Sequence, residues 1–198
     1  MEFILASNNA KKLDEMRRIL SEMGFSVISQ REAGCSFEVD ETGATFAENA
    51  YLKARAVTEH TGRAAIADDS GLMVEALGGE PGIYSARYTG NHDDTDEQRV
   101  SFLLKKLGDE KDRKAKFVSS VCCTFPNGDV LRAEGECRGE ILFAPRGKNG
   151  FGYDPIFKPD GYEKSMAELS SEEKDSISHR GKSLEIFKEE LRRYYADK

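Results

Sequence analysis

The chain has 198 residues, of which 38% are hydrophobic and 33% are charged, so it can bury a substantial core. Its formal net charge of −7 argues against a general nucleic-acid-binding surface, which would need a basic excess or a basic stripe. No apolar run approaches the ~18–20 residues that span a bilayer, and the N-terminus lacks the basic region of a secretory signal. We therefore expect a cytoplasmic protein that forms one large domain or two closely joined lobes (residues 1–198), with no nucleic-acid or membrane partner.

The opening segment predicts a strand, a polar turn, a helix and a second strand. An apolar run over residues 2–6 is typical of a buried strand, and Asn8 and Asn9 can cap the helix that follows. Gly24 is a typical helix stop, and residues 25–29 then predict a strand.

A capping box, Thr45 with Glu48, predicts a second helix that runs through about Glu59. Asn49 and Lys53 are four residues apart and therefore share one face of this helix. A second capping box, Thr95 with Gln98, predicts a third helix in the same way.

The middle of the chain predicts strands. A buried strand is expected over residues 64–67, and we expect it to end at the polar sequence Asp-Asp-Ser-Gly, residues 68–71. Alternating residues over 116–125 and 130–138 flank a strong turn and predict a long hairpin. With a helical segment from Ser171 onward, the sequence predicts a mixed α/β chain with a central sheet.

The cysteines have no spacing typical of a zinc site or a disulfide framework. Cys122 and Cys123 are adjacent in a predicted strand, so they should point to opposite faces and act as small buried hydrophobes. The other two are Cys35 and Cys137.

The turn from Ser7 to Lys12 lies between a strand and a helix. A helix N-terminus offers free N–H groups and a positive dipole end, which suits phosphate, and Lys12 can reach an anion there. The segment is not a P-loop, because it lacks the glycines of that motif. Ordinary capping beside a solvated lysine pair is the alternative.

Carboxylates follow the predicted strand and precede the second helix. Asp68 and Asp69 could hold Mg²⁺ or orient a water molecule, and Glu41 could add a metal ligand near Lys53. The alternatives are a polar turn and an acidic loop.

Two further segments carry polar groups suited to a nucleotide. In residues 171–181, Lys174 and Arg180 suit phosphate or base edges and His179 suits a heterocycle, although a solvated helix face is the alternative. In GKNGFGYDPIF, residues 147–157, the glycines would let the backbone approach a ring closely. The alternative is a flexible turn leading into an edge strand. Together the motifs predict a magnesium-dependent enzyme that acts on a nucleotide.

The chain resembles the inosine triphosphate pyrophosphatase family, and more closely its bacterial XTP/dITP diphosphatases. The resemblance runs from residue 5 to about residue 183, in six blocks that keep the family's order. The blocks are SNNAKK, ETGATFAENAYLKA, ADDSGL, LGGEPGIYSARY, GFGYDPIF and EEKDSISHRG.

This resemblance implies an elongated α/β fold in which two lobes, with a cleft between them, flank a long-stranded mixed central sheet covered by helices. It also implies a homodimer that hydrolyses XTP, ITP and dITP to the monophosphate and pyrophosphate with Mg²⁺, and so cleanses the nucleotide pool.

The resemblance further implies a role for each motif residue. Asp69 would activate the attacking water, and Glu41 and Asp69 would hold Mg²⁺. The remaining motif residues would bind the substrate: Ser7, Asn8, Asn9, Ala10, Lys11, Lys12 and Lys53 toward the triphosphate, Ser70 beside them, and Phe151, Gly152, Tyr153, Asp154, Lys174, His179 and Arg180 around the base and nucleotide.

One position departs from the family pattern. Many members have Thr-Gly-Asn where this chain has Ser7-Asn8-Asn9, so the turn must accept Asn8 in place of glycine. Asparagine tolerates left-handed backbone angles better than most residues.

Two alternatives to the diphosphatase are a Maf-like pyrophosphatase acting on modified pyrimidine nucleotides and a non-catalytic nucleotide-binding regulator.

Overall fold

The computed structural model describes residues 2–91 and 93–196, which fold into two compact units. Unit 1 takes in the chain up to Asp69, residues 119–135 and the chain from Arg180 onward, and unit 2 takes in residues 70–118 and 136–179. Each unit has its own hydrophobic core.

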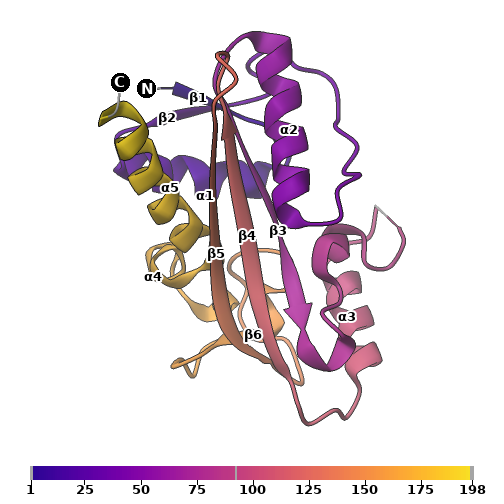
Figure 1. The fold of residues 1–198 in the computed structure, drawn as a ribbon. Coiled ribbons are helices and arrows are strands. Elements are labelled where there is room, and N and C mark those ends of the chain that lie inside the picture. Colours follow the sequence, from indigo (N-terminus) through magenta and orange to yellow (C-terminus); the bar gives the residue numbers. More distant parts are fainter. Residues whose placement is uncertain (1, 92, 197–198) are drawn as a thin grey trace. The chain divides into compact units, whose positions relative to one another are not determined.

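Six strands form one sheet in the order β2-β1-β3-β4-β5-β6 (Figure 1). β1 pairs in parallel with β2 and β3, whereas β5 pairs antiparallel with β6, so the sheet is mixed as expected. The strands are β1 (Glu2–Leu5), β2 (Ser26–Ser29), β3 (Ala65–Val74), β4 (Lys114–Thr124), β5 (Val130–Ile141) and β6 (Phe157–Pro159).

Helices connect and follow the strands, which confirms the predicted α/β class. They are α1 (Ala10–Glu22), α2 (Phe46–Thr61), α3 (Asp96–Leu107), α4 (Ser171–Ile177) and α5 (His179–Ala196). The C-terminal helical segment is therefore divided, because Ser178 adopts an extended backbone between α4 and α5. In the described ranges no helix combines the length and apolar character that a membrane crossing requires.

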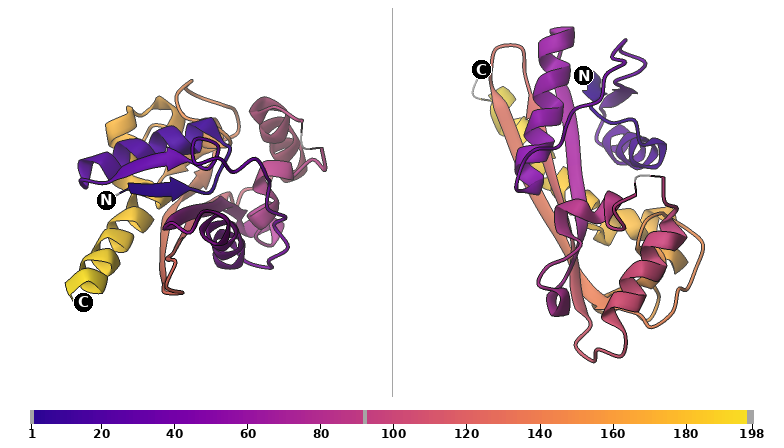
Figure 2. Two further views of the ribbon diagram at one scale, coloured as in Figure 1. Left: turned by 90° about the horizontal axis from the view of Figure 1, so that it is seen from above. Right: turned by 90° about the vertical axis from the view of Figure 1, so that its right-hand side faces the viewer.

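Successive residues of β1 pack against different helices within unit 1. Phe3 and Leu5 belong to a core built with α1 and α5, whereas Ile4 belongs to a core built with α2. Because neighbouring side chains of a strand point to opposite faces, α1 and α5 cover one face of this part of the sheet and α2 covers the other. Figure 2 shows α1 and α2 on opposite sides of the strands.

The core of unit 2 lies between α3 and the residues that precede α4. Leu103, Ile156 and Phe157 are completely buried there, and the rings of Phe117 and Phe157 have centroids 4.7 Å apart. This core supports the glycine-rich segment, which ends in β6 at the edge of the sheet. The edge strand that the alternative interpretation of this segment expected is therefore present.

Local capping signals predict the helix starts correctly. Asn9 caps α1, and the Thr95–Gln98 capping box at α3 has both of its reciprocal hydrogen bonds. At α2, Thr45 accepts from the Glu48 backbone N–H, but the Glu48 carboxylate accepts from the backbone of Ala44 instead of from Thr45.

The predicted end of the third strand is wrong. β3 does not stop at Asp68 but continues through Asp69 and Ser70 to Val74. Two buried residues, Leu72 and Val74, extend the strand into the core of unit 2, and the polar residues before them are held by long-range contacts. The two carboxylates therefore lie inside an extended strand and not in a turn at its end.

Strand β4 is buried on both faces and not only on the face that carries its large apolar residues. Its hydroxyl side chains are satisfied locally: Ser120 donates to Glu134, and Thr124 shares a hydrogen bond with Thr58. Cys122 and Cys123 belong to two different cores, which confirms that they point to opposite faces, and all four cysteines are free and buried.

Candidate active site

The turn before α1 presents polar groups at a helix N-terminus. Ser7 Oγ accepts from the Asn9 N–H at 3.1 Å, and Asn9 Oδ1 accepts from the Lys12 N–H at 3.1 Å. Asn8, Asn9, Ala10 and Lys11 are exposed. Because the cap uses the side-chain oxygen of Asn9, its amide NH₂ can still donate to an anion. The turn therefore suits phosphate.

Asn8 fits this turn without strain. No non-glycine residue in the ranges 2–91 and 93–196 has a positive φ, so Asn8 does not adopt the left-handed backbone that would favour glycine. The departure from the family pattern at this position leaves the turn intact.

Two lysines approach Asp68 of β3 from different helices. Lys12 Nζ, from α1, lies 3.0 Å from Asp68 Oδ2 and 3.5 Å from its carbonyl oxygen. Lys53 Nζ, from α2, donates to the same carbonyl oxygen at 3.1 Å. Two ammonium groups near one peptide oxygen concentrate positive charge, which suits a polyphosphate.

The pKa values of these two lysines move in opposite directions. Burial lowers the pKa of Lys12 more than its ion pair with Asp68 raises it. Burial also opposes the charge on Lys53, but the carboxylates of Asp69 and Glu41 outweigh it, so the pKa of Lys53 is raised. Lys53 is therefore firmly cationic.

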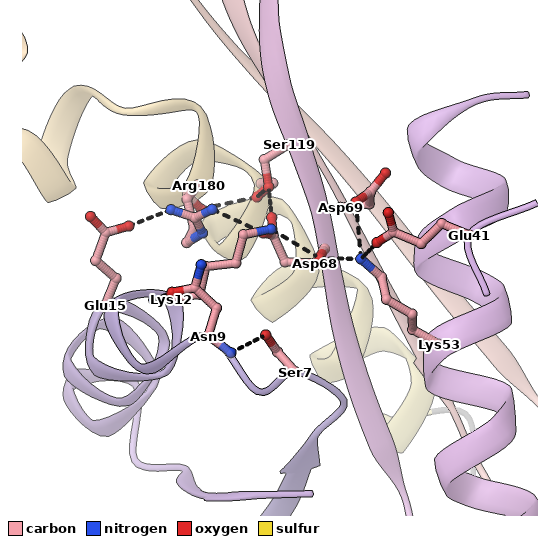
Figure 3. A network of polar contacts seen from close by, with 11 residues as sticks. Ser7, Asn9, Lys12, Glu15, Glu41, Lys53, Asp68, Asp69, Ser119 and Arg180 are labelled. Atoms are coloured by element: carbon pink, nitrogen blue, oxygen red, sulfur yellow. Dashed lines mark hydrogen bonds and ion pairs between the residues drawn. The ribbon is translucent and has the colours of Figure 1, made fainter. Parts of the chain in front are cut away.

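Asp68 lies in a closed set of polar contacts (Figure 3). Its Oδ2 accepts from Arg180 Nη2 at 2.9 Å and its Oδ1 accepts from Ser119 Oγ, while Arg180 Nη1 donates to Glu15. Arg180 is 1% exposed. Burial would raise the pKa of Asp68, but Arg180 and Lys12 outweigh it, and the pKa lies well below its usual range. Asp68 is therefore a fixed anion that holds Lys12.

The surroundings of Arg180 differ from those expected of a base-reading donor. Its guanidinium forms buried ion pairs with Glu15 on α1 and Asp68 on β3, all within unit 1. These contacts favour a role in holding Asp68 and, through it, Lys12. A direct contact between Arg180 and a base stays a prediction from the resemblance.

Asp69 has a different environment from its neighbour. Its Oδ1 accepts from Lys53 Nζ at 2.9 Å, and the same ammonium lies 2.8 Å from Glu41 Oε1. Its Oδ2 is buried and has no hydrogen-bond partner among the described residues. Burial raises the pKa of Asp69, and the charges of Lys53 and Lys12 only partly oppose it. A carboxylate with an unengaged oxygen and a raised pKa suits a general base.

The predicted Mg²⁺ ligands, Glu41 and Asp69, lie on either side of the Lys53 ammonium. No group of three or more His, Cys, Asp or Glu side chains is placed to hold a metal ion within the described ranges. Mg²⁺ nevertheless often binds one or two carboxylates and completes its shell with water and substrate phosphates. The buried Asp69 Oδ2 is an oxygen that such an ion would satisfy, so the two carboxylates fit Mg²⁺.

A second cluster of predicted site residues lies within unit 2. Asp154 Oδ2 accepts from the Phe151 backbone N–H at 2.9 Å and from Lys174 Nζ at 2.7 Å. The Lys174 ammonium also lies 4.8 Å from the centroid of the Phe151 ring. Asp154 and Lys174 are both buried, whereas Phe151 is half-buried. The cluster thus presents an aromatic ring held by a buried ion pair.

Three other predicted site residues belong to unit 2, and two of them are buried by contacts with the protein itself. His179 is buried and stacks on Phe117, with ring centroids 4.7 Å apart. Tyr153 is buried and donates its hydroxyl to the Ser85 carbonyl at 2.8 Å. Ser70 is half-buried in β3 directly after Asp69.

Sequence reasoning did not single out Glu15, Ser119 or Asp96. Glu15 and Ser119 complete the contacts around Arg180 and Asp68, and Asp96 accepts from the Gly152 N–H at 2.8 Å. Glu15 is a charged residue on the buried side of α1, beside Met16, which was a signal available in the sequence. Ser119 and Asp96 carry no such signal.

The chain belongs to the Ham1 family, whose family model matches residues 3–190. The family covers both units described above, including every residue of the two clusters.

Relatives of known name and a solved structure match nearly the whole chain. A Synechococcus protein named dITP/XTP pyrophosphatase is 47% identical over 189 residues, which covers 95% of this chain and 88% of the relative. A Gloeobacter violaceus protein of the same name is 50% identical over 181 residues, covering 91% and 89%. The solved structure of the Staphylococcus aureus Ham1 protein is 43% identical with a TM-score of 0.86, and the match covers 97% of this chain and 98% of that one.

Proposed function

We propose that this protein is a nucleoside triphosphate diphosphatase that hydrolyses the non-canonical purine nucleotides XTP, ITP and dITP to the monophosphate and pyrophosphate. The observation that carries this proposal is the environment of Asp69: a buried carboxylate with a raised pKa beside Lys53 and Glu41, near the half-buried Lys12. The relatives named dITP/XTP pyrophosphatase support the same substrate class. Neither the Maf-like nor the non-catalytic alternative is favoured.

The residues of unit 1 would carry the chemistry. The N-terminus of α1 and the ammonium groups of Lys12 and Lys53 would bind the triphosphate and stabilise charge on its oxygens as the bond breaks. Asp69 would accept a proton from the water that attacks the α-phosphorus, and pyrophosphate would leave. Asp68, fixed as an anion, would orient Lys12.

Glu41 and Asp69 would hold Mg²⁺, which supplies charge neutralisation at the phosphate oxygens when bound. Both carboxylates already contact Lys53, so this lysine would keep them at the phosphate-binding end of unit 1.

The residues of unit 2 would recognise the base. Phe151 would stack on the purine, and the buried Lys174–Asp154 pair would hold that ring in place. Hypoxanthine and xanthine carry an oxygen at position 6 where adenine carries an amino group, so a hydrogen-bond donor at that position favours the deaminated bases. Lys174 has the right chemistry for such a donor.

We also propose the partners, the oligomeric state and the location of the enzyme. The net charge of −7 supports free nucleotides rather than nucleic acid as partners. The resemblance supports a homodimer, and a cytoplasmic location without a membrane partner is the expectation from the sequence.

A substrate panel tests the proposed function. We expect pyrophosphate release from XTP, ITP and dITP with Mg²⁺. Rates with ATP should be lower by about fivefold to 150-fold for each unsatisfied donor, because such a donor costs ~1–3 kcal/mol. Pyrophosphate and monophosphate should form in equal amounts. Comparable rates with ATP would refute the base selectivity, and release of orthophosphate instead of pyrophosphate would refute attack at the α-phosphorus.

Removal of the metal ion tests the proposed role of Glu41 and Asp69. We expect chelation with EDTA to abolish hydrolysis of ITP and added Mg²⁺ to restore it, because the lysines alone leave part of the triphosphate charge unneutralised. Circular dichroism should stay unchanged during chelation. Full activity in EDTA would contradict the magnesium requirement.

A further inference from the structure

The turn formed by residues 151–154 in unit 2 is tied to the start of α3. Asp96, the first residue of α3, accepts the Gly152 N–H through Oδ2 at 2.8 Å. The two residues are 56 positions apart in the sequence, so this hydrogen bond joins two segments of unit 2 that are distant along the chain. It acts on the residue between Phe151 and Tyr153, at the centre of the proposed base-binding turn.

No neighbouring atoms pack against Gly152 on the side where a Cβ atom would lie. A Cβ atom added to this glycine would meet no other heavy atom within 4 Å, and its backbone has a φ of +62°. Gly152 and Asp96 both line a pocket with a volume of about 510 Å³, together with apolar residues such as Val100 and Pro155. The Gly152 peptide is therefore held by hydrogen bonds at both ends: the Gly152 N–H donates to Asp96, and the Phe151 carbonyl oxygen accepts from the Asp154 N–H at 3.2 Å.

Asp96 is itself held rigidly. Its Oδ1 accepts from Arg99 Nη2 at 2.6 Å, and Arg99 Nη1 donates to the carbonyl oxygens of Asp94 at 2.5 Å and Ala86 at 3.2 Å. The N-terminus of α3 does not need Asp96 as a cap, because Thr95 and Gln98 already make both hydrogen bonds of a capping box there. The Asp96 carboxylate is thus an acceptor held by Arg99 on its own helix, and it also accepts the N–H of Gly152 from a distant segment.

We propose that Asp96 is a positioning residue for base recognition, which holds the Gly152 peptide so that the turn presents Phe151 to the purine ring. This inference rests on the proposed function, in which Phe151 stacks on the base. The chemical groups Asp69 and Lys53 belong to unit 1, so loss of Asp96 should weaken nucleotide binding and leave the chemical step largely unchanged.

The first experiment compares Asp96→Ala with a matched control in steady-state hydrolysis of ITP. We expect KM to rise by about tenfold to a hundredfold, the range for loss of a hydrogen bond to a charged group, while kcat stays within about threefold of wild type. The control is Glu97→Ala, which removes the other acidic residue from the first turn of α3 and should leave KM unchanged.

The second experiment repeats Asp96→Ala in a Phe151→Ala background. If Asp96 acts through the turn, the second substitution should add less than about threefold to KM, because the ring that Asp96 positions is already absent. An additive rise in KM, a fall in kcat at unchanged KM, or identical kinetics for Asp96→Ala and Glu97→Ala would overturn the inference.

Two further readouts keep the outcomes distinct. Asp96→Asn keeps a neutral acceptor and should raise KM by about half as much on a logarithmic scale, since charge-assisted hydrogen bonds are about twice as strong as neutral ones. This variant carries the test if Asp96→Ala does not fold. Wild-type protein that fails to hydrolyse ITP refutes the proposed function, whereas active wild type with an unchanged KM in both variants refutes only the role of Asp96.

Discussion

Replacing Asp69 by asparagine should lower turnover of ITP by about 10²–10⁴-fold, the usual contribution of a general base. The reason is that the asparagine amide keeps the shape of the side chain but cannot accept the proton of the attacking water. Lys53 would keep its contact with Glu41, so the phosphate-binding groups should stay in place. Affinity for ITP, measured by calorimetry without Mg²⁺, should therefore remain within about threefold of wild type.

A surface carboxylate provides the control for Asp69→Asn. Glu59 is an exposed residue of α2 that pairs with Arg55 four residues before it, and Glu59→Gln should leave turnover unchanged. If Asp69→Asn retained turnover within about tenfold of wild type, Asp69 could not be the base.

Replacing Asp68 by asparagine should destabilise the protein rather than act on the chemistry alone. The substitution removes the anion shared by Arg180 and Lys12, and leaves the buried Arg180 and the half-buried Lys12 with one carboxylate fewer. Removing one partner of a buried ion pair typically costs about 3–5 kcal/mol, and we expect the free energy of unfolding in urea at pH 7 to fall by that amount. Glu59→Gln, at an exposed pair, should change it little.

The pH dependence of stability separates Asp68 from a general packing effect. Burial would raise the pKa of Asp68, but Arg180 and Lys12 lower it well below its usual value, so the folded state binds the proton less tightly than the unfolded state does. The stabilisation is therefore present above the unfolded pKa of about 3.9 and is lost as the pH falls through the lower, folded value. The difference between wild type and Asp68→Asn should stay constant from about pH 5 to 8 and shrink below about pH 4. A constant difference down to strongly acidic pH would indicate loss of packing instead.

The parts of the fold that depend on neighbouring residues were predictable from the sequence. The cap of α1 at Asn9 and the capping box of α3 involve residues at most three positions apart, so their patterns are complete in a short window. The apolar stripe of α5, which includes Leu184 and Phe187, is equally local, and both residues are completely buried.

The parts that depend on distant residues were not predictable. Glu15 and Arg180 are 165 positions apart, and neither position alone indicates that the other neutralises it. The continuation of β3 past Asp69 was missed for a related reason. Two adjacent aspartates are unfavourable in a strand unless distant cations compensate them, and Lys12, Lys53 and Arg180 become neighbours only in the folded chain.

The extended backbone of β3 at Asp68 and Asp69 has a consequence for how the protein tolerates change. Successive residues of β3 face opposite sides of the sheet. Ile66 packs with α1 and α5 on one side, and Ala67 packs with α2 on the other. One carboxylate, Asp68, is thereby held by Lys12 and Arg180, while its neighbour Asp69, only ~3.3 Å further along the strand, keeps a buried oxygen without a hydrogen-bond partner. A single-residue insertion before Asp68 would exchange their faces and place the Asp69 carboxylate on the side of Lys12 and Arg180. The spacing of this strand should therefore be far less tolerant of insertion or deletion than of substitution.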